Sequence, residues 1–272
     1  MDTYRFPLLD EPTEHGFMPT MTAYVLERNE DGPRPMVIVI PGGGYEMVAE
    51  NWEGERIAMA YLNAGFNAAV VDYCVAPHRH PLPLMNAAAA VRICREHAGE
   101  WQVDENKIAV CGFSAGGHLA ASISNLWDCE DYFTKEEIES RIYRPDASIL
   151  CYPVITSGEK AHKGSFLNLL GAENEGSPLW KAMSMETRVH EGTPPAFLWH
   201  TFEDDCVPVE NSLLYASALK AQEIPFELHI FPKGHHGLSL TTQSLPRNRS
   251  VFSRDYGWMG LSIDWLSEVF GL

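Results

Sequence analysis

The chain alternates between short apolar runs and longer stretches in which apolar positions recur with the period of a helix. The apolar runs predict strands at residues 36–40, 67–73, 107–113, 147–154, 195–201 and 226–231. The amphipathic stretches predict helices at about residues 53–63, 84–97, 114–125, 210–222 and 255–270. Strands that alternate with helices are typical of βαβ units, so the pattern predicts an α/β fold with a mostly parallel sheet flanked by helices.

Two segments interrupt this alternation. Residues 127–145 are rich in charged side chains, and residues 156–193 are rich in glycine and serine with only short helical patches. We expect both to be small, lid-like insertions over one edge of the sheet, near the active site. The chain contains no internal repeat, low-complexity tract or Pro-rich linker, so the prediction is a single domain over residues 1–272.

The strongest chemical signal is a GxSxG pentapeptide at 112–116, directly after an apolar strand and directly before a helix. A sharp turn from strand to helix lifts the serine hydroxyl above the sheet, and small flanking residues avoid a clash with the neighbouring backbone. In this context the pattern predicts that Ser114 is a nucleophile.

A serine hydroxyl is a weak nucleophile at neutral pH, so it needs a base, and the base needs an acid to orient it. The loop after the fifth predicted strand offers Asp204 and Asp205, and the loop after the sixth offers His235 and His236. The carboxyl ends of parallel strands meet at one edge of the sheet, so we expect these loops to reach Ser114. The choice within each pair stays open at this point.

A glycine-rich turn, PGGGY at 41–45, follows the first predicted strand. Glycines let the main chain approach a substrate closely and direct amides at a developing oxyanion. A dinucleotide site needs GxGxxG spacing and a phosphate-binding P-loop needs a following GK[ST], and neither is present. The turn therefore predicts an oxyanion hole.

Four motifs, PGGGY, GFSAGGHLAA, PPAFLWHTFEDDCVPVENS and FPKGHHGLSL, resemble the α/β-hydrolase esterases and most closely the carbohydrate acetyl esterase and acetyl xylan esterase-like branch. The resemblance extends from about residue 36 to the C-terminal helix. It implies an α/β-hydrolase fold, with Asp204 as the acid of a DxxVP pattern and His236 as the base of an HG pair. It also implies an oxyanion hole built from the backbone amides of Gly43, Gly44 and Ala115.

One position departs from related esterases. Hormone-sensitive-lipase relatives carry HGGG, whereas this chain has Pro41 in place of that histidine. The difference favours the sugar-esterase branch and leaves open which glycine amide donates.

Four other residues are candidates for substrate contacts, with packing roles as the alternative: Tyr45, Trp52, Trp180 and His235. Tyr45 follows the glycines, and the two tryptophans lie where aromatic rings stack on sugars. His118 and His200 are expected to be structural.

The 37 acidic and 20 basic side chains give a formal net charge of −17. A surface of that sign repels phosphate backbones and anionic lipid headgroups, so nucleic acid and membranes are poor partners. We see no secretory signal and no apolar stretch of the roughly 18 to 20 residues that a membrane helix needs, so we expect a cytoplasmic protein. The six cysteines show no CxxC pair and no matching histidine spacing, so we expect neither a zinc site nor a disulfide framework. The predicted serine chemistry requires no metal and no cofactor.

These features together predict a serine carboxylesterase that works through an acyl-enzyme on a small-molecule or oligosaccharide ester. The resemblance implies short acyl groups, acetyl first, on sugars or xylo-oligosaccharides. Three alternatives stay open: a feruloyl or other aromatic-acyl esterase, a peptidase or amidase on the same fold, and a non-catalytic binding protein. The sequence also leaves a homo-oligomer open.

Overall fold

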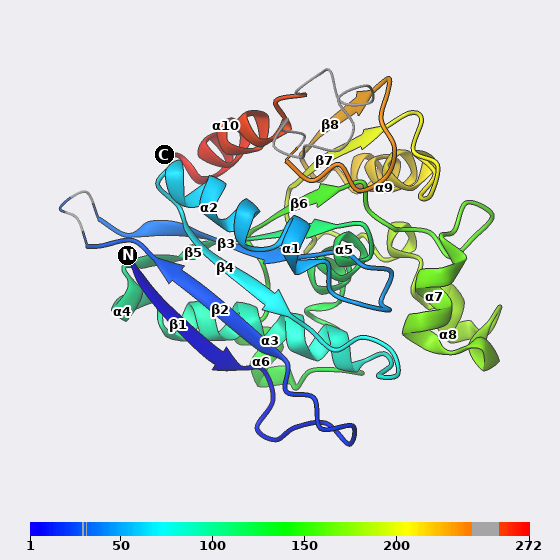
Figure 1. Cartoon of the computed structure of the whole chain (residues 1–272), viewed down its shortest axis with the longest axis horizontal. Helices are drawn as coiled ribbons and strands as arrows, with labels where there is room; N and C mark the ends of the chain where they lie inside the picture. The colour runs from blue at the N-terminus through cyan, green and yellow to red at the C-terminus, as the bar shows by residue number, and fades with distance from the viewer. Residues whose placement is uncertain (29, 31, 241–255) are drawn as a thin grey trace.

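The computed structural model describes residues 1–272 except 29, 31 and 241–255, and its strands form one eight-stranded sheet (Figure 1). The order across the sheet is β1-β2-β4-β3-β5-β6-β7-β8. The six neighbouring strands β4, β3, β5, β6, β7 and β8 run parallel to one another. Strand β2 is antiparallel to both of its neighbours, β1 and β4. The strands are β1 (Asp2–Pro7), β2 (Thr20–Val25), β3 (Arg34–Ile40), β4 (Asn67–Asp72), β5 (Val103–Phe113), β6 (Ala147–Cys151), β7 (Ala196–Thr201) and β8 (Phe226–Phe231).

The parallel part of the sheet corresponds to the six predicted strands, which confirms the predicted α/β fold. The antiparallel pair β1 and β2 extends the sheet beyond β4 and was not predicted. Strand β3 reads as a continuous apolar run because it is buried on both faces in the middle of the sheet.

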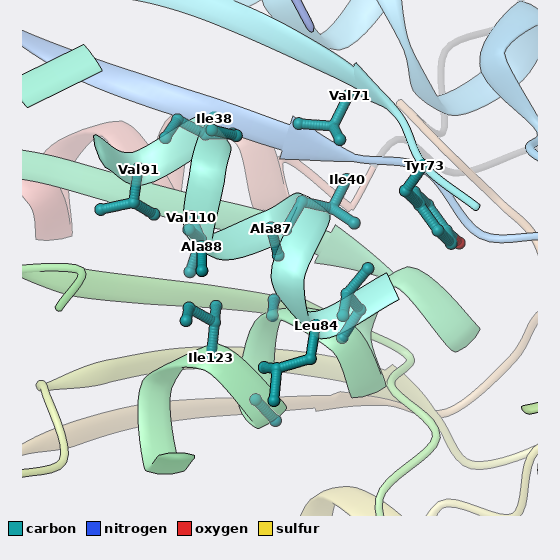
Figure 2. Close-up of a cluster of buried hydrophobic side chains, with 14 of the residues drawn as sticks. Ile38, Ile40, Val71, Tyr73, Leu84, Ala87, Ala88, Val91, Val110 and Ile123 are labelled. Atoms are coloured by element: carbon teal, nitrogen blue, oxygen red, sulfur yellow. The ribbon is translucent and has the colours of Figure 1, made fainter. Parts of the chain in front are cut away.

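Helices cover both faces of the sheet, and the strands send alternate side chains to each side. Ile38 and Ile40 of β3 belong to a core shared with α3 (Leu82–Glu96), α5 (Ala115–Leu126) and α9 (Glu210–Ala221). The neighbouring residues Val37 and Val39 belong to a second core with α2 (Glu55–Asn63) and α10 (Trp258–Phe270). Figure 2 shows the first core, where α3 and α5 place small and branched side chains against the strands: Leu84, Ala87, Ala88, Val91 and Ile123 beside Ile38 and Val110.

The predicted helices all correspond to observed ones, with shifted ends. The predicted helix at 53–63 is divided by Gly54 into α1 (Glu50–Glu53) and α2. The predicted helix at 255–270 is α10, and its first predicted residue lies outside the described part of the chain. The remaining helical segments are α4 (Ala98–Trp101), α6 (Lys135–Ser140), α7 (Lys163–Leu170) and α8 (Pro178–Ala182), with 3₁₀ turns at Ala172–Asn174 and Met185–Thr187.

The two segments expected to be insertions contact different parts of the molecule. Segment 127–145 is held against the end of α3, because Arg95 donates hydrogen bonds to backbone carbonyls of this segment and to Asp146. Segment 156–193 contains α7 and α8, and its Asn168 side chain donates to the carbonyl of Gly44 at 2.9 Å. The second segment therefore reaches the glycine-rich turn. The single-domain assignment and the place of both segments near an active site stay predictions.

Candidate active site

Ser114 occupies the turn between β5 and α5, with a positive φ of 53°. The flanking glycines are required by close backbone contacts. A Cβ on Gly112 would lie 2.2 Å from the carbonyl oxygen of Gly116, and one on Gly116 would lie 2.2 Å from that of Ile40. The turn is tied to the next strand, because the Ser114 amide donates to the Cys151 carbonyl at 3.0 Å. This local geometry explains why small residues surround the serine.

Three side chains from separate loops form a hydrogen-bonded chain. Nε2 of His236, on the loop after β8, lies 2.7 Å from Oγ of Ser114. Nδ1 of the same imidazole lies 2.8 Å from Oδ2 of Asp204, on the loop after β7. A carboxylate only accepts, so Nδ1 carries the proton and donates to Asp204, while Nε2 accepts from the Ser114 hydroxyl. This tautomer can take the serine proton during nucleophilic attack.

The Asp204 carboxylate is inaccessible to solvent and fully hydrogen-bonded. Oδ1 accepts from the amides of Cys206 at 3.0 Å and Val207 at 2.8 Å, and Oδ2 accepts from His236 and, at 3.2 Å, from His200. Burial raises the pKa of Asp204, but the hydrogen bonds from His200, His236 and Cys206 lower it by more, to well below its usual range. The carboxylate is therefore ionised at neutral pH.

The adjacent candidates take no part in this chain. Asp205 is exposed and accepts a long hydrogen bond, 3.4 Å, from the amide of His236. His235 is also exposed, and its Nδ1 lies against the carbonyl of His236. The structure thus brings Asp204 and His236 to Ser114 and leaves Asp205 and His235 at the surface.

The glycine-rich turn lies beside the serine. A Cβ on Gly42 would come within 2.9 Å of Cβ of Ser114, so only glycine fits there. The Gly42 amide already donates to Oε2 of Glu53 at 2.8 Å. In the described part of the chain, the amides of Gly43, Gly44 and Ala115 have no hydrogen-bond acceptor. These three amides can therefore donate to an oxyanion.

Tyr45 and His118 support this turn from inside the protein. The Tyr45 hydroxyl lies 2.9 Å from Nδ1 of His118, and Nε2 of that imidazole donates to the Met183 carbonyl at 2.9 Å. Burial lowers the pKa of His118 to about 4, so the ring is neutral and Nδ1 accepts from Tyr45. Both ring nitrogens are occupied, as expected for a structural histidine, and Tyr45 is buried with it.

A narrow gap between side chains, too small for a water molecule, adjoins the turn on this side. Its lining comprises Tyr45, His118, Val154, Ser165, Phe166 and Leu169. Segment 156–193 supplies three of these residues, and a Cβ on Gly44 would lie 4.0 Å from the Ser165 hydroxyl. Mostly apolar side chains therefore fill this side of the turn, and the gap offers no room for a substrate group.

The two tryptophan candidates occupy different environments. Trp52, on α1, is 50% exposed, and its carbonyl accepts a hydrogen bond from Ser239, three residues after His236. Trp180 is buried against Phe166, with ring centroids 5.3 Å apart, and its indole N–H donates to the Ser157 carbonyl. Trp52 is thus the tryptophan available to a ligand.

Sequence reasoning missed several residues near the site. Glu53 is buried and bonded to the glycine-rich turn, His200 contacts Asp204, and Phe202 is 70% exposed two residues before Asp204. Burial lowers the pKa of His162, and its electrostatic interactions with His236 and Asp204 indicate that this ring also lies near them. His200 and Phe202 lie inside the PPAFLWHTFEDDCVPVENS motif, but the motif does not show that either residue lies near the site. Glu53 and His162 lie outside the four motifs.

Between residues 1 and 272, leaving out 29, 31 and 241–255, there is no cluster of three or more His, Cys, Asp or Glu side chains arranged to hold a metal ion. Over the same residues, no helix has the length and apolar character needed to cross a membrane.

The chain is similar to known proteins. The BD-FAE family matches residues 23–219. Endo-1,4-beta-xylanase B from Butyrivibrio fibrisolvens is 40% identical over 251 residues, covering 90% of this chain and 37% of that protein. The acetylxylan esterase of Xylanibacter ruminicola is 32% identical over 239 residues, covering 82% of this chain and 47% of that protein. The chain therefore spans less than half the length of these two relatives.

A solved structure matches the chain over nearly all of both lengths. The acetyl ester-xyloside bifunctional hydrolase from Caldicellulosiruptor lactoaceticus is 40% identical, with a TM-score of 0.85, and the match covers 98% of this chain and 96% of that one. The comparisons confirm the predicted α/β-hydrolase fold and the resemblance to the acetyl xylan esterase-like branch.

Proposed function

Because the chain belongs to the BD-FAE family and has an α/β-hydrolase fold, we propose that it is a serine carboxylesterase that removes short acyl groups, acetyl first, from sugars or xylo-oligosaccharides. The observation that carries this proposal is the hydrogen-bonded chain from Ser114 through His236 to Asp204. The Ser114 hydroxyl lies at the same edge of the sheet as the backbone amides of Gly43, Gly44 and Ala115. These amides lack acceptors in the described structure.

The proposed reaction proceeds through an acyl-enzyme. Oγ of Ser114 attacks the ester carbonyl while Nε2 of His236 takes its proton, and ionised Asp204 stabilises the imidazolium that forms. The amides of Gly43, Gly44 and Ala115 donate to the oxyanion, where one such donor contributes roughly 3 kcal/mol to transition-state stabilisation. His236 then returns the proton to the leaving alcohol and activates the water that releases the acid.

Two features support the proposed substrate class. The names of the relatives refer to acetylxylan and to acetyl ester and xyloside hydrolysis, which are activities of those proteins. Exposed Trp52 offers an aromatic surface to a sugar. Neutral sugar esters also suit a chain with a net charge of −17, which repels anionic partners.

We place this activity in the cytoplasm, on imported oligosaccharides rather than on polymeric xylan. All six cysteines are free thiols and four of them are buried, which fits a reducing compartment. Fractionation of cells that produce the full-length protein tests this location.

The test of the function is a time course on a defined mixture of acetylated xylo-oligosaccharides, with released acetate quantified and the remaining acetyl positions assigned. Wild type is expected to release acetate, and Ser114→Ala is expected to release none above background. Methyl ferulate and an aminoacyl anilide serve as comparison substrates. Faster turnover of either comparison substrate would assign the site to aromatic-acyl esters or to amides instead.

A further inference from the structure

Glu53 is a buried acidic residue that the proposed reaction does not use. It is the last residue of α1 and is 5% exposed, in contrast to Glu50 and Glu55 on either side, which are exposed. Burial of a carboxylate is unfavourable unless hydrogen bonds replace the lost water. The contacts of Glu53 therefore indicate why the side chain is there.

The two carboxylate oxygens of Glu53 bind two different loops. Oε2 accepts from the amide of Gly42 at 2.8 Å, and Oε1 accepts from the hydroxyl of Tyr152 at 2.6 Å. The Tyr152 hydroxyl itself accepts from the amide of Ser239 at 3.0 Å, which leaves its proton for Glu53. Both partners donate, so the geometry uses both oxygens as acceptors.

The Gly42 contact occupies the first amide of the glycine-rich turn. Gly42 packs against Ser114, and with its amide occupied by Glu53 the following amides of Gly43 and Gly44 remain without an acceptor in the described structure. Those two residues have positive φ values of 122° and 66°. The Glu53 bond anchors the turn at the residue before them.

The contact between Glu53 and Tyr152 connects Glu53 to the loop of the proposed base, His236. The Tyr152 ring meets the His236 ring edge-on, with centroids 5.0 Å apart, and its hydroxyl holds the amide of Ser239 in the same loop. Tyr152 and Ser239 are non-glycine residues with positive φ, a backbone conformation that needs support from its surroundings. The second oxygen of Glu53 thus supports the loop that carries His236.

We propose that Glu53 is a positioning residue: one carboxylate links the oxyanion turn, through Gly42, to the loop of His236, through Tyr152, and so sets the two halves of the catalytic machinery relative to each other. This inference rests on the proposed function. Burial raises the pKa of Glu53, and the hydrogen bonds from Tyr152 and Gly42 oppose that rise, as expected for a carboxylate held by donors.

Glu53→Gln tests the link with almost no change in volume. A glutamine amide has one acceptor oxygen and an NH₂ group that only donates, so the NH₂ group must face the Gly42 amide or the Tyr152 hydroxyl. We expect kcat for p-nitrophenyl acetate to fall about 10- to 100-fold with KM changed less than about threefold, because misplaced oxyanion donors affect the transition state more than substrate binding. Exposed Glu55→Gln is the matched control and is expected to keep wild-type kcat. Active sites are counted by fluorophosphonate titration, so that kcat refers to folded enzyme alone.

Tyr152→Phe provides a second measurement that keeps the ring against His236 and removes only the hydroxyl link. We expect kcat to fall about tenfold, and the double variant to match Glu53→Gln within about threefold, because both changes break the same link. If Glu53→Gln does not fold, the kcat of Tyr152→Phe alone tests the positioning role of Glu53.

Wild-type kcat per titrated site in both variants would overturn the inference, even with a lowered Tm, because Glu53 would then only stabilise the fold. Absence of ester turnover by wild type itself would instead overturn the proposed function. The two failures are therefore distinguishable in one experiment.

Discussion

His200 and Asp204 form a buried contact in which Nε2 of the imidazole lies 3.2 Å from Oδ2 of the carboxylate, with neither side chain accessible to solvent. The same oxygen receives the hydrogen bond of His236. The remaining His200 contacts, to the Val207 carbonyl and the Ser212 hydroxyl, are 2.9 and 2.8 Å long. His200 therefore holds the acid loop between β7 and α9 as well as the acid itself.

Replacement of this histidine is expected to cost both stability and activity. His200→Ala leaves a cavity and unpaired polar groups at Val207 and Ser212, so the free energy of unfolding should fall by about 2–4 kcal/mol. kcat should also fall, because Asp204 loses one of its donors. Urea denaturation and ester turnover measure the two effects. His229→Ala, at the sheet edge and partly exposed, is the control with little expected change; equal stability of the two variants would contradict this role of His200.

Neighbouring aspartates are expected to differ sharply in their effect on turnover. Asp204→Asn removes the carboxylate that orients His236, and kcat should fall by about 10⁴-fold. Asp205→Asn changes an exposed side chain whose contact with the His236 amide is long, and kcat should stay within about threefold of wild type. Steady-state kinetics with an acetyl ester separates the two. A large loss in Asp205→Asn with activity retained in Asp204→Asn would reverse the assignment of the acid.

Covalent labelling tests the nucleophile independently of the substrate. A fluorophosphonate should label wild type at Ser114 and leave Ser114→Ala unlabelled, because only an activated serine attacks phosphorus. Ser122→Ala is the matched control: Ser122 is also buried on α5, but its hydroxyl donates to the His118 carbonyl. Equal labelling of wild type and Ser114→Ala, read by intact-protein mass, would show that another residue reacts.

The sequence was most informative where local backbone geometry restricts the residue type. Close contacts at Gly112 and Gly116 demand glycine, so the turn around Ser114 could be located from its letters alone. The part of strand β3 from Met36 to Ile40 was equally clear, because it is buried on both faces and holds only apolar residues. By contrast, β1 at the sheet edge is largely exposed, and its mixed composition gave no strand signal.

The contacts that depend on tertiary structure could not be predicted. The Glu53 carboxylate meets Tyr152 across 99 positions of sequence, and no local pattern marks either residue as a partner. His200 was expected to be structural, and only the structure places it against Asp204. Likewise, Trp52 and Trp180 looked equivalent as sugar-stacking candidates, although one is exposed and the other is buried.

This difference between the tryptophans predicts opposite phenotypes. Trp52→Ala should raise KM for acetylated xylo-oligosaccharides about five- to tenfold, through loss of a stacking surface, while turnover of p-nitrophenyl acetate and the Tm stay near wild type. Trp180→Ala removes a buried ring next to Phe166 and should lower the free energy of unfolding by about 3–5 kcal/mol. Steady-state kinetics with the two substrates measures the first effect, and urea denaturation measures the second. An unchanged KM in Trp52→Ala would exclude that ring from the sugar site.

His118 makes a specific prediction for the pH dependence of stability. Burial lowers its pKa from 6.5 to about 4 in the folded protein, so between these values the unfolded chain binds more protons than the folded one. Stability should therefore fall as pH decreases from about 6.5 to about 4, by about 3 kcal/mol from this residue alone. Asp204 acts in a different window: its pKa is depressed, so its contribution is present above the unfolded value near 4 and is lost only at lower pH.

His118→Gln separates this contribution from the others. A glutamine can accept from the Tyr45 hydroxyl and donate to the Met183 carbonyl, but it does not titrate. The loss of stability between pH 7 and pH 4.5, measured by urea denaturation, should be about 2–3 kcal/mol smaller in the variant than in wild type. Burial also lowers the pKa of His80 to about 4, so part of the slope should remain in the variant. Identical slopes in the two proteins would show that His118 takes up its proton as readily in the folded state as in the unfolded one.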